Sequence, residues 1–245
     1  MNSSLFEDPG RALDAIQRVQ SAQDCIAVRD LLDEARAALG VRQAVFVSFI
    51  QDETHESFRI LLAGNPSWCL AYQERHWFAH DAWLLYAATH SEPVSDAVIP
   101  IRTKGQREAR AVAAEFGMTS AYVVPAPAAS GLTRVGVLVL GSDQIGFFDG
   151  PSTGTLKILA RSLAMELHEW WVRQIRDELM ATNGLGLDDL QLLDMARKGL
   201  SAKEMSNALG ISKASVDNRF QRLNTKFKMP NRRATARLAA EHGLI

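Results

Sequence analysis

The spacing of apolar residues predicts an alternation of helices and strands along most of the chain. A helical pattern covers residues 12–39, in which Ala12, Ile16 and Val19 share one face and Gly40 marks the end. Runs rich in β-branched and aromatic residues predict strands. These runs lie at residues 41–50, 57–64, 121–128 and 134–141, and further helical patterns lie at 67–89 and 106–116. Strands in adjacent pairs, with helices before and between them, predict an α/β/α sandwich on an antiparallel sheet.

A long helix is predicted from the Gly-Pro-Ser sequence at 150–152 to about Met180. Pro151 suits its first turn, and Ser152 or Thr153 is placed to cap it. Its apolar stripe is too wide for a solvated helix. The stripe packs on the sheet of the same chain, forms the seam of a homodimer, or does both. Its residues are Leu156, Leu159, Leu163, Leu167, Trp170, Trp171 and Ile175.

Two glycines, Gly184 and Gly186, interrupt the pattern and predict a linker at 181–187. The fold class is therefore α+β, with a first domain at 1–180 and a second, all-α domain at 188–245. In the second domain, a helix is expected at 188–198, followed by Gly199 at its C-terminal end. Ser201 and Glu204 form an S-x-x-E capping box that begins the next helix, which ends near Leu209.

A tight turn at 210–212 then leads to a third helix, from Lys213 to about Lys226, and a fourth begins at Arg232. Two short helices joined by a glycine-containing turn are typical of a helix-turn-helix. On the third helix, one face is apolar and would pack in the core, and a second stripe is basic. The apolar face consists of Val216, Phe220, Leu223 and Phe227.

The second helix of a helix-turn-helix enters the major groove, where Arg and Asn read base edges and Lys and Ser contact phosphates. Candidate DNA-binding residues are Lys213, Ser215, Asn218, Arg219, Arg222 and Lys226, with Arg232 and Arg233 at the fourth helix. A basic stripe alone is more often a solvated face. The cap, the glycine turn and the stripe together favour DNA binding.

The net charge of −1, taken over the whole chain, argues against binding to nucleic acid. Divided at Leu185, however, the chain has a charge of −6 before the division and +5 after it. This asymmetry is typical of a protein with one nucleic-acid-binding part.

Other features narrow the class of protein. Two cysteines exclude a disulfide framework, and neither a signal peptide nor an 18-residue apolar run is evident, so we expect a cytoplasmic protein that does not contact a membrane. The P-loop, G-x-S-x-G and G-x-G-x-x-G motifs are absent, so an enzyme is not expected. His76 and His80 have the i, i+4 spacing of a metal pair, but no third ligand is evident and surface histidines are the favoured interpretation. Neither a metal nor a cofactor is expected.

The C-terminal residues resemble the LuxR-type DNA-binding domain over about 60 positions. The resemblance depends on Leu187-Asp-Asp-Leu-Gln-Leu-Leu193, Gly199-Leu-Ser-Ala-Lys-Glu204, Ile211-Ser212, Ser215-Val216, Lys226-Phe227 and Gly243-Leu-Ile245. Asp189 replaces the usual glutamate, Ser215 the usual threonine and Arg219 the usual histidine.

The sequence Trp68-x-x-x-Tyr72, followed by Asp81, resembles the acyl-homoserine-lactone-binding domain of quorum-sensing LuxR-type regulators. The resemblance implies that the Trp68 indole donates to a lactone carbonyl, Asp81 accepts from the ligand amide, and Tyr72 donates to the acyl carbonyl. Aromatic core packing of Trp68 and Tyr72 is the alternative. Ala82 replaces the family's proline, no tryptophan lies around 93–95, and Ala121 replaces a glycine.

The combined resemblance implies a ligand-responsive, dimeric transcription regulator. It would sense an N-acyl-homoserine lactone or a similar small molecule and bind a palindromic promoter site on double-stranded DNA. A ligand-independent DNA-binding protein, whose first domain serves only dimerisation, is the alternative that the departures favour. The acyl-chain length, the operator sequence and the sign of regulation do not follow from the sequence.

Overall fold

The computed structural model describes residues 8–51, 56–75, 77–127, 134–150 and 153–245. The chain forms two compact units, and the division falls within a long helix, between Trp170 and Trp171. We call the part up to Trp170 the N-terminal unit and the part from Trp171 the C-terminal unit. The boundary predicted at residue 180 lies within the same helix.

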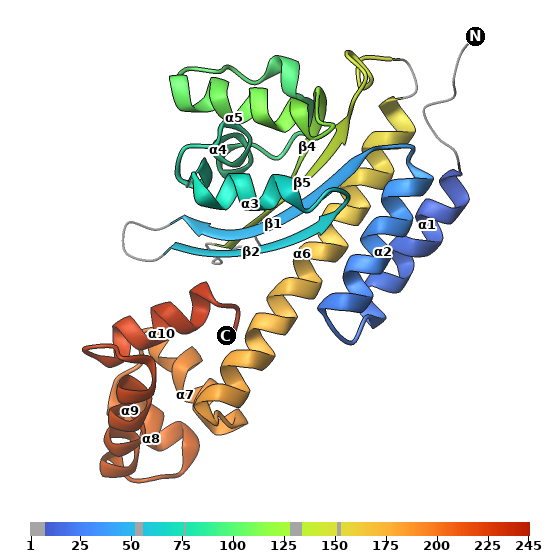
Figure 1. Cartoon of the computed structure of the whole chain (residues 1–245). Coiled ribbons are helices and arrows are strands. Elements are labelled where there is room, and N and C mark those ends of the chain that lie inside the picture. The colour runs from blue at the N-terminus through green and yellow to red at the C-terminus, as the bar shows by residue number, and fades with distance from the viewer. Residues whose placement is uncertain (1–7, 52–55, 76, 128–133, 151–152) are drawn as a thin grey trace. The chain divides into compact units, whose positions relative to one another are not determined.

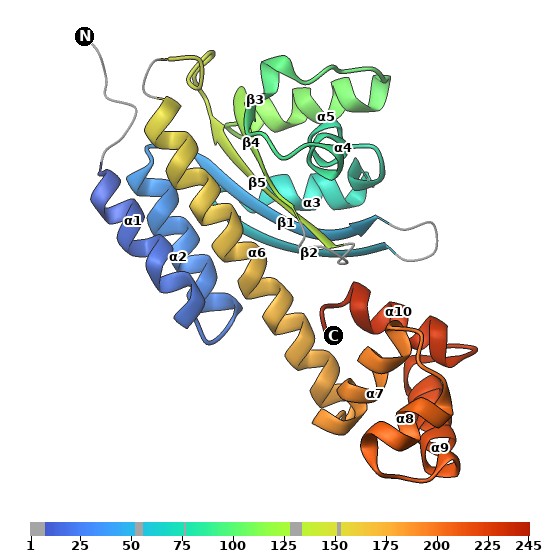
Figure 2. The same ribbon diagram turned by 180° about the vertical axis from the view of Figure 1, so that it is seen from behind.

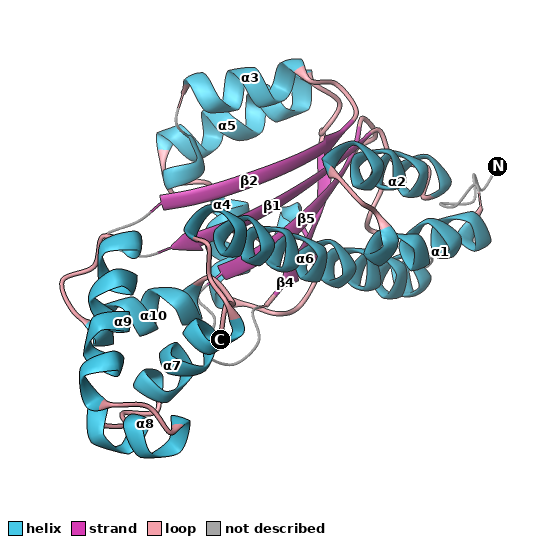
Figure 3. Ribbon diagram, turned by 90° about the horizontal axis from the view of Figure 1, so that it is seen from below, coloured by secondary structure: helices cyan, strands magenta, loops and turns pink. Residues whose placement is uncertain are grey.

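The N-terminal unit is built on a five-stranded antiparallel sheet with the strand order β2-β1-β5-β4-β3. Figure 3 shows the first four of these strands side by side. The strands are β1 (Gln43–Gln51), β2 (Glu56–Ala63), β3 (Val94–Ser95), β4 (Ser120–Ala126) and β5 (Arg134–Ser142). The central pairing places Val45 opposite Val139 and Val123 opposite the same residue of β5.

Helices cover both faces of this sheet, as the predicted α/β/α sandwich requires. Figures 1 and 2 show α1, α2 and α6 on one face and α3, α4 and α5 on the other. The helices are α1 (Pro9–Arg18), α2 (Cys25–Ala38), α3 (Ser67–Glu74), α4 (Ala82–Thr89), α5 (Lys104–Glu115) and α6 (Thr153–Asn183). Short 3₁₀ turns lie at Val19–Ser21 (η1), Trp77–Ala79 (η2) and Asp96–Val98 (η3).

Two predicted helices are each divided in the structure. The pattern at 12–39 forms α1 and α2, because the Asp24 carboxylate accepts hydrogen bonds from the backbone N–H groups of Ile26 and Ala27 and so begins a new helix. The Trp170 indole N–H donates to the carbonyl of Ala22 at 2.9 Å and fixes the break. In the same way, Asp81 divides the pattern at 67–89 and caps α4.

Alternation along the strands distributes the core between the two helical layers. Val45, Val47 and Phe49 of β1 pack in a buried cluster with the side chains of α3, α4 and α5. The predicted Ser-Gly turn between the last two strands, and the first-turn Pro151 and candidate cap Ser152 predicted for α6, lie outside the described residues. Strand β3 was not predicted, since two residues give too short a pattern.

The long helix α6 is described from Thr153 and extends to Asn183, three residues beyond the predicted end. Ala181, Thr182 and Asn183 are compatible with a helix, and Gly184, directly after it, has a left-handed backbone with a φ of 53°. The helix thus extends into the predicted linker, and residues 184–186 lie between α6 and the next helix, which begins at Leu187. The predicted apolar stripe from Leu156 to Trp170 is buried within the N-terminal unit, so packing within the same chain accounts for its burial.

The C-terminal unit contains the four predicted helices after the end of α6. They are α7 (Leu187–Arg197), α8 (Ala202–Leu209), α9 (Lys213–Phe227) and α10 (Arg232–Glu241). The Ser201–Glu204 capping box is present, with the Ser201 N–H donating to the Glu204 carboxylate at 2.7 Å. Gly210 ends α8 in the left-handed region (φ 64°), and the Ser212 hydroxyl accepts from the N–H of Ser215 to begin α9.

Candidate ligand-binding and DNA-binding sites

The three residues predicted to bind the ligand lie together at one small cavity in the N-terminal unit. Trp68 and Tyr72 are one turn apart on α3, and Asp81 is the residue that caps α4. All three side chains are buried. The cavity has a volume of about 20 Å³, which is room for about one water molecule.

Asp81 holds this cluster together through both oxygens of its carboxylate. The Tyr72 hydroxyl donates to Oδ2 at 2.5 Å, and the N–H groups of Trp83 and Leu84 donate to Oδ1 at 2.6 and 3.4 Å. A carboxylate oxygen accepts more than one hydrogen bond, so Asp81 retains capacity for a ligand N–H. The Tyr72 proton, by contrast, is directed at Asp81, and it would have to turn away to serve an acyl carbonyl.

Burial determines the protonation behaviour of the pair. Desolvation raises the pKa of Asp81, while the hydrogen bonds from Tyr72, Trp83 and Leu84 act in the opposite direction. Desolvation and the neighbouring carboxylate raise the pKa of Tyr72 well above its ordinary value. The phenol therefore stays protonated at neutral pH and acts as a hydrogen-bond donor.

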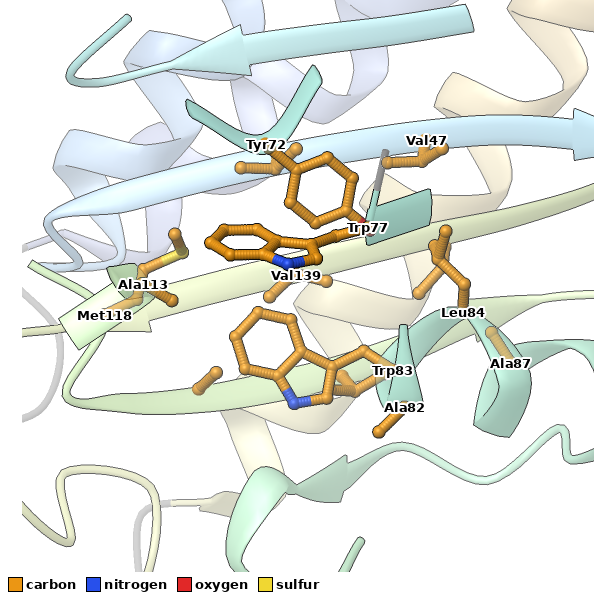
Figure 4. Packing of buried hydrophobic residues seen from close by; sticks show 14 of the residues in the cluster. Val47, Tyr72, Trp77, Ala82, Trp83, Leu84, Ala87, Ala113, Met118 and Val139 are labelled. Atoms are coloured by element: carbon orange, nitrogen blue, oxygen red, sulfur yellow. The ribbon is translucent and has the colours of Figure 1, made fainter. Parts of the chain in front are cut away.

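The Trp68 indole supplies a buried donor beside this pair. Its Nε1 has no hydrogen-bond partner among the described residues. A buried N–H without a partner carries a free-energy cost that an acceptor on a ligand would remove. The ring also packs on Tyr72, with centroids 4.8 Å apart, and Tyr72 meets Trp77 edge-on. Figure 4 shows Tyr72, Trp77 and Trp83 grouped over Val139 of the sheet. Tyr72 thus packs among aromatic core residues and also borders the cavity.

The cavity has further walls that the sequence motif did not indicate. Trp83, Gln106 and Arg110 line it, the last two from α5. The guanidinium of Arg110 lies 2.7 Å from the carboxylate of the buried Asp96, which also accepts from the N–H of Ala121 at 2.9 Å. Helical spacing on α5 would have placed Gln106 and Arg110 on one face, but no sequence signal placed that face opposite Trp68.

The C-terminal unit presents the predicted helix-turn-helix, and the predicted core face of α9 is buried. The residues of the predicted basic stripe contact two different parts of this unit. Arg219 and Arg222 reach α7, where they pair with Asp188 at 3.1 Å and Asp189 at 2.6 Å. Lys226 donates to the carbonyls of Asn183 and Gly184 at the end of α6. The Asp189 side chain is 6% exposed, so its pair with Arg222 contributes to the packing of this unit.

The other predicted DNA-binding residues lie at the surface or near it. Lys213, Asn218, Arg232 and Arg233 are exposed, and Ser215 is half-buried with its hydroxyl 2.8 Å from that of Ser212. Two exposed polar residues of α9, Gln221 and Thr225, were not predicted. They lie opposite the apolar face, a position that the helical period of 100° per residue would have indicated.

A metal site gains no support from the described residues. No cluster of three or more His, Cys, Asp or Glu side chains within them is arranged to hold an ion. His80 is exposed, and His76 lies outside the described residues. Across the described part of the chain, every helix is too short or too polar to cross a membrane.

Two family models match the chain. The model of the autoinducer binding domain matches residues 26–167, and the model of bacterial regulatory proteins of the luxR family matches residues 189–239. The comparison with curated protein sequences gave no match.

Solved structures share the fold. The crystal structure of Escherichia coli SdiA has 15% identity and a TM-score of 0.71, covering 96% of this chain and 97% of that one. SdiA in complex with octanoyl-rac-glycerol has 16% identity and a TM-score of 0.70, covering 95% and 94%. The N-acylhomoserine-lactone-dependent LuxR family factor CepR2 of Burkholderia cenocepacia has 21% identity and a TM-score of 0.55, covering 65% and 95%. The chain belongs to the LuxR-type regulators, in which an autoinducer-binding domain precedes a luxR-family DNA-binding domain.

Proposed function

We propose that this protein is a ligand-responsive transcription regulator of the quorum-sensing type. Its N-terminal unit binds an N-acyl-homoserine lactone or a similar small amphipathic molecule, and its C-terminal unit binds a palindromic promoter site as a homodimer. The single observation that supports it most is the grouping of the buried, unpartnered Trp68 indole N–H (considered among the described residues) with the Tyr72–Asp81 pair at one cavity.

The chemistry of this group suits an acylated amide. The indole N–H is a donor for a carbonyl, and the Asp81 carboxylate is an acceptor for an amide N–H. Two relatives of the same fold support an amphipathic ligand, since one is described with octanoyl-rac-glycerol and another as dependent on an N-acylhomoserine lactone. At about 20 Å³ the cavity is far smaller than the roughly 300–1,000 Å³ of ordinary ligand sites, so binding requires the aromatic walls to move.

For DNA, exposed cations and polar groups on α9 and α10 support the proposal. Lys213 and Asn218 lie on the first half of α9, the part that enters the major groove in a helix-turn-helix. Arg232 and Arg233 lie in the first turn of α10, where the backbone N–H groups also favour phosphate. Arg219, Arg222 and Lys226 remain candidates, and each would have to exchange an intramolecular partner for DNA.

Ligand binding and DNA binding are coupled, in this proposal, through stability. A ligand that completes the core of the N-terminal unit stabilises the folded state by about 2.7 kcal/mol at a concentration 100 times its dissociation constant. The test uses the full chain, purified from cells grown with and without N-octanoyl-homoserine lactone. We expect a higher melting temperature, and tighter binding to its operator DNA, for the protein prepared with lactone. Equal values for both preparations would refute the coupling.

A ligand-independent regulator is the second candidate, and the small volume of the cavity favours it. In that case the N-terminal unit is a dimerisation module with an aromatic core. Mass spectrometry of small molecules extracted from the purified protein separates the two candidates. A stoichiometric acylated compound supports the first, and a protein that binds its operator with no extractable compound supports the second.

A further inference from the structure

The outer face of α9 carries uncharged side chains. The apolar face of this helix, with Val216 and Phe220, is buried in the C-terminal unit. At about 100° per residue, Ala214, Asn218 and Gln221 lie on the opposite side of the helix, and all three are exposed. We call these three residues the outer face of α9. This face is the part of α9 that is most accessible to a partner outside the unit.

The two arginines of α9 lie to one side of the outer face and are held there by carboxylates of α7. Arg219 pairs with Asp188 at 3.1 Å, and Arg222 pairs with Asp189 at 2.6 Å. The Asp189 side chain is 6% exposed, and it also accepts from the N–H of Gly186 at 3.3 Å. If Arg222 left this carboxylate to reach a base, a buried charge would lose its partner, which is strongly unfavourable. Reading of guanine by an arginine therefore competes with an intramolecular ion pair.

The two amide side chains of the outer face have no such competition. Neither Asn218 nor Gln221 makes a side-chain hydrogen bond within the described residues. The half-buried Asn224 of the same helix differs, since its side chain accepts from the Thr235 hydroxyl at 2.6 Å. A side-chain amide offers an acceptor and a donor side by side, and this pair matches the N6 donor and N7 acceptor of adenine. Both outer amides can thus meet a base without breaking an internal bond.

We propose that Asn218 and Gln221 read adenines in the major groove and that the Ala214 methyl group contacts a thymine methyl, so that α9 selects A·T base pairs. The inference rests on the DNA binding in the proposed function, and it names the bases that the operator contains. Asn218 and Gln221 are three residues apart, which is about 4.5 Å along the helix axis. This spacing exceeds the step of about 3.4 Å between base pairs, so each amide meets a different base pair.

Affinity that does not depend on sequence comes, in this proposal, from other side chains. Lys213, Arg232 and Arg233 are exposed, and none has an ion pair within the described residues. Contacts from such cations to phosphates orient a protein on DNA but carry no sequence information. The exposed Asp217 borders the outer face and disfavours phosphate there. Selection of bases and salt-dependent affinity therefore belong to different residues, which can be altered separately.

The test selects binding sites from a randomised double-stranded DNA library with the full chain, once with N-octanoyl-homoserine lactone and once without it. Asn218→Ala and Gln221→Ala are compared with the unaltered protein. Gln191→Ala removes an exposed amide from α7 and is the matched control. All three positions are exposed, so we expect the fold to be retained, and the melting temperature checks this. Gln221→Glu introduces a carboxylate, which accepts from the amino group of cytosine.

We expect adenines at two positions of the selected half-site, with one preference lost in Asn218→Ala and the other in Gln221→Ala. Replacing either adenine by 7-deazaadenine, which lacks N7, should weaken binding of the unaltered protein by about fivefold or more, and binding of the matching alanine variant by less than about twofold. Gln221→Glu should change the preferred base at its position from adenine to cytosine. Gln191→Ala should match the unaltered protein, and neither alanine variant of α9 should change the salt dependence, since no phosphate contact is lost.

Two results would overturn the inference while leaving DNA binding intact. One is a half-site with guanines whose preference is abolished by Arg219→Ala or Arg222→Ala. The other is an adenine preference that both Asn218→Ala and Gln221→Ala retain. If the full chain enriches no sequence from the library, with or without lactone, the proposed function fails together with the inference. Should both alanine variants bind no DNA, the 7-deazaadenine duplexes decide the result, and unchanged affinity of the unaltered protein for them would contradict adenine reading.

Discussion

Acid should destabilise the N-terminal unit through one buried histidine. His168 of α6 is 3% exposed, and burial, with the nearby positive charge of Arg134, lowers its pKa to about 4 from 6.5. Its Nδ1 has no hydrogen-bond partner among the described residues. The folded state thus disfavours the imidazolium, which the unfolded chain accepts freely.

The sign and size of the effect follow from this difference. Because the folded pKa is below the unfolded one, the stability from neutral His168 is present above pH 6.5 and is lost as the pH falls toward 4. At 1.36 kcal/mol per pKa unit, the full difference amounts to about 3 kcal/mol. About 2 kcal/mol of it should be lost between pH 7 and pH 4.5.

The assay compares urea unfolding of the unaltered protein and His168→Leu at pH 7, 5.5 and 4.5. Tryptophan fluorescence follows the relevant part of the chain, since all five tryptophans lie at or before residue 171. Between pH 7 and pH 4.5, we expect the free energy of unfolding of His168→Leu to rise by about 2 kcal/mol relative to that of the unaltered protein. Other titrating groups affect both proteins equally and cancel in the comparison. A parallel loss of stability in both proteins would refute the assignment to His168.

Three further changes have distinct expected outcomes. Gly136→Ala places a methyl carbon 2.8 Å from the buried imidazole of His168 and 2.9 Å from the ring of Phe46, so urea unfolding should show that the free energy of unfolding falls by about 1–3 kcal/mol. Gly105→Ala, whose new methyl group would have no atom within 4 Å, should leave the free energy of unfolding unchanged. Tyr72→Phe removes a donor from a buried carboxylate and should cost about 1–3 kcal/mol in the same assay; an unchanged midpoint would show that the pair is not formed. Arg222→Ala should weaken operator binding and reduce its salt dependence, whereas Asp189→Asn should leave the salt dependence intact. If gel-shift titrations at two salt concentrations show no change for either variant, Arg222 is not part of the DNA-binding face.

The features that the sequence predicted well depend on local chemistry. The buried face of α9, with Val216 and Phe220, follows from helical periodicity, and the start of α8 follows from the reciprocal bonds of Ser201 and Glu204. Neighbours along the chain determine both, so no knowledge of the rest of the fold was needed.

The features that were missed depend on partners distant in the chain. Arg219, Arg222 and Lys226 were predicted to bind DNA, and no local pattern indicated that each of these side chains has an intramolecular partner 31 to 43 positions away. The walls contributed by Gln106 and Arg110 come from a helix whose position over α3 no local pattern specified. The break between α1 and α2 was missed because apolar spacing continues across it, and only the capping role of Asp24 indicates it.

The double role of Asp81 limits how this protein can change its ligand over evolutionary time. The same carboxylate begins α4 and borders the cavity, and loss of a helix cap costs about 1 kcal/mol even before Tyr72 loses its acceptor. Selection for a new head group therefore meets a stability barrier at this residue. Wall positions that are only half-buried and support neither a helix end nor an ion pair, such as Ile101 and Ala109, present a lower barrier. New ligand preferences in a lineage of such proteins should accumulate at those walls while the capping carboxylate persists.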